Sequence, residues 1–72
     1  MRIMKNAYRL DEEKRTFERM FVTWSEKNYI EYWRDGTQYH EFTGAPGIYW
    51  FDTRLEAQGY LDYINAPENQ AA

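Results

Sequence analysis

Asp35-Gly36 is the feature of the sequence that most constrains the fold, because it joins two alternating runs that are rich in aromatic residues. The runs cover residues 29–34 and 37–42. A two-residue turn of type I′ needs a positive φ at both central positions, which glycine adopts without steric cost and aspartate tolerates. The sequence therefore predicts a β-hairpin over residues 29–42.

The register of this hairpin follows from its turn. Pairing across the turn places Arg34 opposite Thr37 and Glu31 opposite His40, and side chains alternate between the two faces of each strand. One face then carries Ile30, Tyr32, Arg34, Thr37, Tyr39 and Glu41, and the other carries Tyr29, Glu31, Trp33, Gln38, His40 and Phe42. Both faces combine aromatic rings with polar groups, so we expect one to face the core and the other to be half exposed.

The length of 72 residues indicates one domain, which we place at residues 1–66 and follow with a flexible tail at residues 67–72. The sequence has no cysteine, so disulfides and thiolate metal sites are excluded. Dense packing must compensate, and seven Tyr, three Trp and four Phe residues can supply it. These are more rings than one small core easily hides, so some of them should lie at the surface.

The N-terminal third contains one clear strand and one ambiguous segment. Residues 2–10 alternate loosely and predict a strand with a basic outer face. Residues 11–15 form a charged tip. Residues 17–24 have apolar side chains at helical spacing, yet the run from Met20 to Trp24 is β-branched and aromatic, as is typical of a strand. We favour the strand, and a helix over residues 12–24 is the alternative.

The C-terminal third predicts a loop, a short strand and a helix. Gly and Pro residues place the loop at 43–47, and the apolar run 48–51 fits a strand that is central or covered on both faces. Thr53 and Glu56 have the spacing of a capping box, which starts a helix over residues 53–65. The helix face expected to pack on the sheet consists of Ala57, Tyr60, Leu61 and Ile64. Leu55 and Gly59 lie on the opposite side.

The expected fold is therefore α+β, with an antiparallel meander of four to five strands and one C-terminal helix packed on it. The alternative order is β-α-β-β-β-α. The chain has no apolar run near the ~20 residues that a membrane span needs and no apolar signal-peptide core, so we expect a cytoplasmic protein.

Catalytic and metal sites find little support in the sequence. Ser25 and His40 are the single serine and the single histidine, and no elbow or glycine-rich oxyanion motif accompanies them. His40 and Glu31 form an expected cross-strand polar pair, but further ligands for a metal are missing. Phosphate-binding motifs are also absent. We therefore expect a non-enzymatic protein without a cofactor.

Charge divides the chain and suggests two classes of partner. Residues 1–36 carry eight basic and seven acidic residues, whereas residues 37–72 carry one basic and five acidic residues. A basic stripe beside aromatic rings would indicate nucleic-acid binding. The residues that could form this stripe are Lys5, Arg9, Arg15 and Arg19. Neighbouring glutamates largely neutralise them, so nucleic acid is the alternative partner.

Protein binding is the favoured function. Tyr and Trp are enriched in protein contacts, and in size and aromatic content the chain is similar to small phage-encoded accessory proteins that bind and inhibit host machinery. Such a protein would act by occupying the surface of a partner, for example a nucleic-acid-processing complex. The candidate contact residues are Tyr29, Trp33, Tyr39, Leu55, Glu56, Tyr60, Asp62 and Tyr63. A homodimer through an edge strand or through the helix face with Leu55 and Gly59 is a further expectation.

Overall fold

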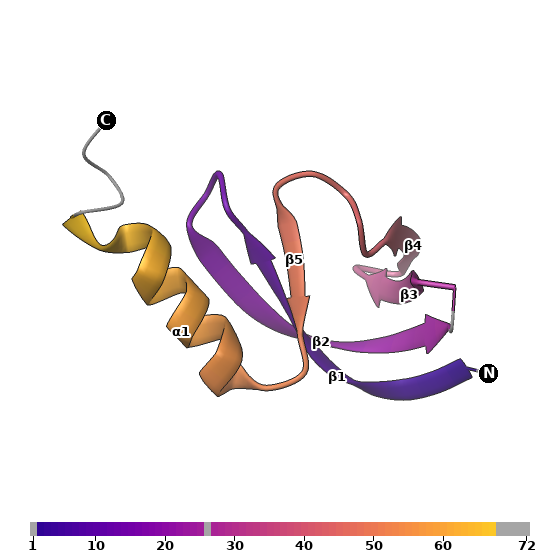
Figure 1. Cartoon of the computed structure of the whole chain (residues 1–72). Helices are drawn as coiled ribbons and strands as arrows, with labels where there is room; N and C mark the ends of the chain where they lie inside the picture. Colours follow the sequence, from indigo (N-terminus) through magenta and orange to yellow (C-terminus); the bar gives the residue numbers. More distant parts are fainter. Residues whose placement is uncertain (1, 26, 68–72) are drawn as a thin grey trace.

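The computed structural model describes residues 2–25 and 27–67, and it confirms the α+β fold (Figure 1). The elements are β1 (Arg2–Asp11), β2 (Thr16–Ser25), β3 (Tyr29–Arg34), β4 (Thr37–Phe42), β5 (Ile48–Phe51) and α1 (Arg54–Asn65). All five strands form one antiparallel sheet in the order β4-β3-β2-β1-β5. The tail predicted at residues 67–72 lies almost entirely outside the described residues.

The ambiguous segment is a strand, so the alternative with a helix over residues 12–24 is wrong. β2 pairs with β1 along all ten of its residues, from Thr16 opposite Asp11 to Ser25 opposite Arg2. The turn between them is closed by a bond from the Arg15 amide to the Asp11 carbonyl at 2.8 Å. A neighbouring strand that offers backbone partners over this length outweighs the helical spacing of a few apolar side chains.

The hairpin predicted at residues 29–42 is confirmed together with its register. Arg34 lies opposite Thr37, and Tyr29 lies opposite Phe42 at the other end. The two turn residues both have positive φ, 51° at Asp35 and 78° at Gly36, as a type I′ turn requires. The faces of β3 and β4 are therefore the two predicted sets of side chains.

The sheet curls strongly, so it has a concave and a convex face. β1 and β4 are three strand spacings apart, roughly 14 Å in a flat sheet. Nevertheless the Arg9 guanidinium in β1 donates to both carboxylate oxygens of Glu41 in β4, at 2.9 and 2.7 Å. Both side chains therefore lie on the concave face, and the β3–β4 hairpin folds back over the β1–β2 ribbon (Figure 1).

The main core fills the concave face. Its buried members are Ala7, Val22, Ile30 and Tyr32, and partly buried Met20, Trp24 and Trp50 pack against them. Trp24 and Trp50 meet edge to face with ring centroids 6.0 Å apart. Because Ala7 shares the face of Lys5 and Arg9, the expectation of a basic outer face on the first strand is wrong: these cations point to the concave side.

A second, smaller core lies on the convex face beneath α1. Thr53 and Glu56 form the predicted capping box, with the Glu56 amide bonded to the Thr53 hydroxyl at 3.2 Å. Ala57 of the helix and Leu10 of β1 are fully buried there. Tyr60, Leu61 and Ile64 are half-buried on the same helix face, which confirms the face predicted to pack on the sheet.

β5 is an edge strand that is covered on both faces, so of the two predicted situations, central or covered, the structure shows the second. Phe51 and Tyr49 contact Tyr60 of α1 on the convex side, with centroids 5.8 and 4.8 Å away. Trp50 packs into the main core on the concave side. Among the described residues, no helix combines the length and the apolar character that crossing a membrane requires.

Candidate protein-binding surface

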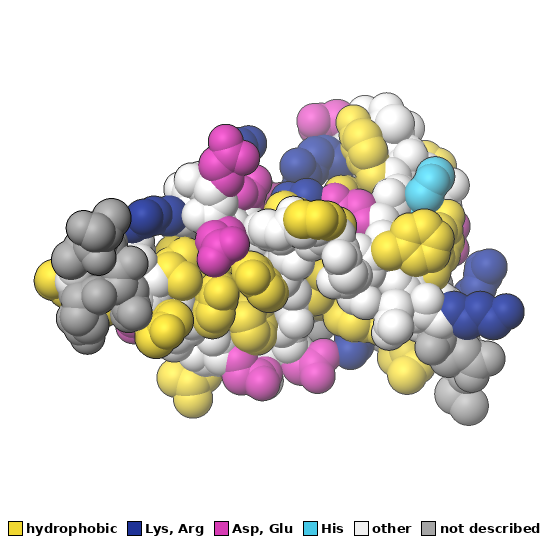
Figure 2. Space-filling model, turned by 45° about the horizontal axis from the view of Figure 1, so that its top comes forward, with side chains coloured by type: hydrophobic (Ala, Val, Ile, Leu, Met, Phe, Trp, Pro, Cys, Tyr) yellow, Lys and Arg dark blue, Asp and Glu magenta, His cyan; other side chains and the backbone are white. Residues whose placement is uncertain are grey.

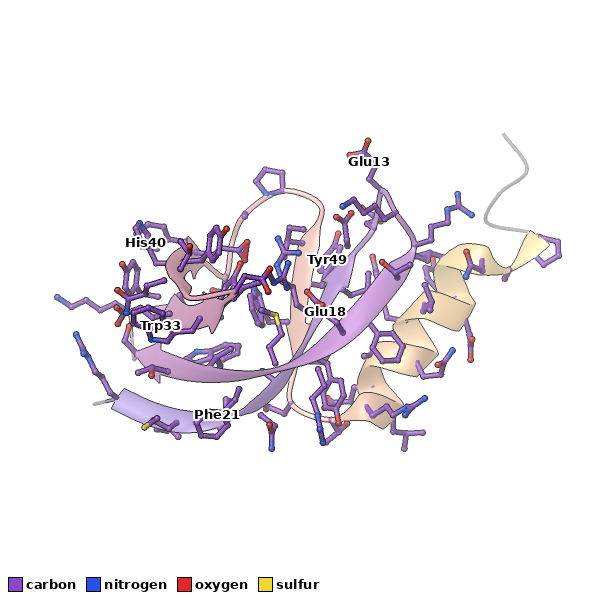
Figure 3. The ribbon with its side chains drawn as sticks, turned by 180° about the vertical axis from the view of Figure 1, so that it is seen from behind. Glu13, Glu18, Phe21, Trp33, His40 and Tyr49 are labelled. Carbon is purple, nitrogen blue, oxygen red and sulfur yellow. The ribbon has the colours of Figure 1, made fainter. Side chains whose placement is uncertain are left out.

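An uncovered apolar surface lies on the convex face at the β3–β4 end of the sheet. Trp33 is 68% exposed, Phe42 61%, Phe21 58% and Met4 66%. The ring pair of Tyr29 and His40 lies between them. We call these six residues the convex aromatic face. Figure 3 shows Phe21 on the outer side of the β1–β2 ribbon and Trp33 and His40 at the β3–β4 end.

Strand pairing brings these side chains together. Met4 lies opposite Thr23 in the β1–β2 pair, and Thr23 lies opposite Glu31 in the β2–β3 pair. Phe21 lies two residues from Thr23 in β2, and Trp33 lies two residues from Glu31 in β3, so side-chain alternation puts both on this same face. Four strands thus contribute to one surface, and the curl of the sheet turns that surface outward.

Ring contacts organise the β3–β4 part of the convex aromatic face. Tyr29 stacks on His40 with centroids 5.4 Å apart and an interplanar angle of 29°. Tyr29 also meets Phe42 edge to face at 5.3 Å. Figure 2 shows His40 in cyan beside hydrophobic side chains at the molecular surface. These contacts hold the rings in fixed orientations before any partner arrives, which lowers the entropy cost of binding.

Glu31 is the acidic group within this surface, and it already has partners. Gln38 donates to its Oε2 at 3.3 Å, and Arg2 lies 3.9 Å from its Oε1. The register opposite His40 is as predicted. The His40 ring in addition stacks on Tyr29.

The size of the convex aromatic face distinguishes it from scattered surface residues. Three rings that are each more than half exposed present roughly 300–450 Å² of apolar surface. The largest patch on a typical monomer is of this size and is often functional. The face remains open because α1 covers only the opposite end of the convex side, over β5 and the tip of the β1–β2 ribbon (Figure 1).

The eight predicted contact residues do not form one surface. Tyr29 and Trp33 lie on the convex aromatic face, whereas Tyr39 lies on the concave side and stacks on Tyr32 at 5.7 Å. The other five belong to α1 at the far end of the molecule: Leu55, Glu56, Tyr60, Asp62 and Tyr63. Sequence reasoning missed Met4, Phe21 and Phe42. Phe42 shares a parity with Trp33 across the predicted hairpin, so that signal could have found it.

The α1 residues are largely engaged within the molecule. The Glu56 carboxylate accepts from the Thr53 amide and hydroxyl, and Asp62 accepts from Gln58 at 2.8 Å. Leu55 is different, because 83% of its side chain is exposed. The acidic residues expected to steer a partner are therefore remote from the convex aromatic face.

Tyr60 connects the helix to the tip of the β1–β2 ribbon. Its hydroxyl donates to Glu12 Oε1 at 3.4 Å, and its ring packs against Tyr49. A hydrogen bond with the Tyr49 hydroxyl, together with desolvation and the Glu12 charge, raises the pKa of Tyr60 to about 12. These contacts give Tyr60 a structural role in attaching the helix.

The four cations of the predicted nucleic-acid stripe do not share a face, so the stripe is wrong as a surface. The Glu41 hydrogen bonds hold Arg9 on the concave side and raise its pKa. Lys5 binds Asp52 at 2.6 Å and lies 4.2 Å above the Trp24 ring. Arg15 donates to Asn65 at 3.3 Å. Arg19 lies opposite Tyr8 on the convex side.

Arg19 instead lines a hollow beside the start of α1. Tyr8, Phe17, Glu18 and Arg54 form the rest of its wall, and its volume is about 550 Å³. The ring of Tyr8 meets that of Phe17 edge to face at 6.1 Å. This hollow brings two guanidinium groups next to aromatic rings. The predicted basic stripe did not include this arrangement.

Metal and family comparisons add no further site. Within residues 2–25 and 27–67, no group of three or more His, Asp or Glu side chains is arranged to hold a metal ion. Comparison of the chain with protein-family models, curated proteins and solved structures finds no match.

Proposed function

We propose that the protein is a small non-enzymatic binding module that occupies the surface of a partner protein with its convex aromatic face, and that it inhibits or regulates that partner. The observation that carries this proposal is the exposure of Trp33, Phe42 and Phe21 on one face of the sheet. Tryptophan is enriched among residues that dominate binding energy, and aromatic rings add apolar area with little loss of side-chain entropy.

The surroundings of His40 and Ser25 also support a binding role rather than catalysis. His40 is stacked on Tyr29 within the aromatic surface. Ser25 lies at the end of β2, opposite Arg2 of β1.

Affinity capture with three matched forms of the chain tests the proposal. The forms are the unmodified chain, the double variant Trp33→Ser with Phe42→Ser, and the control Leu55→Ser, which removes an even more exposed apolar side chain from α1. We expect a stoichiometric protein on the unmodified chain and on the control. The double variant should bind it at least ~30-fold more weakly, since interface residues of this kind contribute about 2 kcal/mol or more.

Two results would contradict this function. One is equal capture by all three forms, which would mean that the convex aromatic face does not contact the partner. The other is a captured species that disappears after nuclease treatment, because nucleic acid would then be the ligand. Thermal unfolding of the double variant is the folding control, and its midpoint should stay close to that of the unmodified chain.

Nucleic-acid binding remains the second candidate, and the hollow with Arg19 and Arg54 is the observation that favours it. Guanidinium groups beside aromatic rings suit a phosphate backbone with stacked bases. A gel shift with single-stranded oligonucleotides across a salt series tests it. Binding at low salt that is lost in Arg19→Gln with Arg54→Gln, but kept in Arg15→Gln, would support this candidate over protein binding.

A further inference from the structure

The outer edge of β4 is an open backbone edge. β4 is the terminal strand of the sheet, and among the described strands its backbone pairs only with β3. Every residue of β4 except Glu41 is exposed. We propose that two copies of the chain associate by antiparallel pairing of their β4 strands about a two-fold axis at Tyr39.

The turn determines which backbone groups point outward. The residues that flank a two-residue turn exchange backbone hydrogen bonds, and bonded and non-bonded pairs then alternate along the hairpin. Thr37, Tyr39 and Glu41 therefore bond to β3. Gln38 and His40 direct their amides and carbonyls away from it. These groups form the row that a second strand needs.

β4 also lacks the features that usually block an open edge. It contains neither lysine nor proline, and its pairing with β3 is continuous from Thr37 to Phe42, without a bulge. The inward charge of Glu41 is neutralised by Arg9 of the same chain. β5, the other edge strand, has only four residues, which leaves it less backbone to offer.

One existing hydrogen bond and one charge select the register. Pairing centred on His40 would set Gln38 against Phe42 of the second copy, but the Phe42 carbonyl already accepts from the Ala45 amide at 3.2 Å. Pairing centred on Gln38 would bring Asp35 opposite Glu41, and like charges opposite each other are unfavourable. Pairing centred on Tyr39 avoids both problems.

In the register centred on Tyr39, the side chains are compatible across the axis. Gln38 lies opposite His40 of the second copy, and Thr37 lies opposite Glu41. The two Tyr39 side chains meet at the axis. Gln38 and His40 of each strand exchange backbone bonds with His40 and Gln38 of the second copy, so the pairing spans residues 37–41 of each copy.

The symmetry has a consequence for the surface. A two-fold axis between antiparallel edge strands is perpendicular to the sheet, so both copies present the convex aromatic face on the same side. Together they offer roughly 600–900 Å² of apolar surface, which approaches the ~800 Å² that one partner contributes to a standard interface. This consequence rests on the proposed function, whereas the self-association does not.

Single cysteines test the register directly, because the chain has none of its own. Tyr39→Cys would place two cysteines in a non-bonded pair with Cα atoms about 4.5 Å apart, within the range of a disulfide. Thr37→Cys, two residues away on the same face, would not meet its counterpart. Under mild oxidation we expect disulfide-linked dimers of Tyr39→Cys at least ~10 times faster than those of Thr37→Cys.

Sedimentation of the unmodified chain from about 1 μM to 1 mM tests self-association. Gln38→Lys with His40→Lys should weaken the dimer at least ~10-fold, since lysine protects edges, and Leu55→Lys, a charge on the α1 surface, should not weaken it. A monomer at 1 mM, equal cross-linking of the two cysteine variants, or a dimer weakened only by Leu55→Lys would overturn the proposal. Trp33→Ser with Phe42→Ser should still dimerise, which separates this test from that of the proposed function.

Discussion

The two ends of the β1–β2 ribbon carry similar aromatic side chains on the same convex face, yet they are used differently. At the tip end, α1 covers the sheet, and Tyr60 of the helix contacts Tyr49 and Phe51 of β5. At the other end no element among the described residues covers the sheet, and Phe21, Trp33 and Phe42 are exposed. The composition is alike, so the single helix decides which rings stabilise the fold and which are available to a partner.

This difference shows why aromatic content alone does not locate a binding site. Tyr60 and Trp33 are both large, and both are favoured in interfaces. Tyr60, however, is tied to Glu12 and Tyr49, whereas Trp33 is 68% exposed. We therefore expect substitutions at the covered end to change stability and substitutions at the open end to change binding.

Leu10→Ala should have the largest effect on stability. Leu10 is fully buried under α1, and a buried Leu→Ala substitution removes about 3 kcal/mol. A Cys-free core of this size supplies roughly 3–5 kcal/mol in total, so the variant should be largely unfolded at room temperature. Urea unfolding followed by circular dichroism measures the loss.

Trp33→Ala is the matched control at the open end. A surface substitution away from packed contacts usually changes stability by less than about 0.5 kcal/mol. If Trp33→Ala cost as much as Leu10→Ala, the convex aromatic face would be part of the core and the comparison between the two ends would fail.

The Arg9–Glu41 pair should have the next largest effect, because it ties β4 back onto β1 across the concave face. Each side chain is only 20% exposed. Glu41→Gln removes the charged acceptor and should lower the free energy of unfolding by about 1.5–3 kcal/mol. Asp52→Asn, which alters the more exposed Lys5–Asp52 pair, should cost about 0–1 kcal/mol. Chemical denaturation of both variants decides whether closure of the curl depends on this pair.

Much of the fold could be predicted from local patterns. Asp35-Gly36 specified a turn, a register and both faces of the β3–β4 hairpin, because turn geometry and side-chain alternation are local properties. Thr53 and Glu56 specified the start of α1 for the same reason.

The site could be predicted only in part, because it depends on the curl of the sheet. No local pattern indicates that Arg9 reaches Glu41 or that the face of β1 with Ala7 is the inner one. The sequence therefore placed Lys5 and Arg9 on an outer surface and did not identify Met4 or Phe21 as exposed. Both errors have one cause. Side-chain alternation assigns the residues of a strand to two faces, but it does not say which face becomes the concave, buried one.

The attachment of α1 should weaken at alkaline pH. The folded-state pKa of Tyr60 is raised to about 12, above the ordinary value of 10.0, because the neutral hydroxyl is hydrogen-bonded and near Glu12. Its contribution to stability is therefore complete below pH 10 and is lost as the pH rises from about 10 to 12. Melting temperatures between pH 9 and 12 should fall less steeply for Tyr60→Phe.

Tyr39→Phe is the control for this pH dependence, because Tyr39 lies on β4, away from the helix. It should follow the alkaline decline of the unmodified chain. An equal decline in Tyr60→Phe would show that the contacts of Tyr60 with Tyr49 and Glu12 do not hold the covered end together.

Gly59→Ala should produce the smallest effect, and it tests whether the outer side of α1 is a simple surface. Alanine is favoured over glycine in a helix interior by about 0.5–1 kcal/mol, and a Cβ at position 59 would meet open space. The variant should therefore unfold at higher temperature, whereas Gly47→Ala, at a φ of 77°, should unfold at lower temperature by calorimetry. If Gly59→Ala instead weakened capture of a partner or self-association, the helix surface would be an interface that needs close backbone approach, and the division between a stabilising end and a binding end would have to be abandoned.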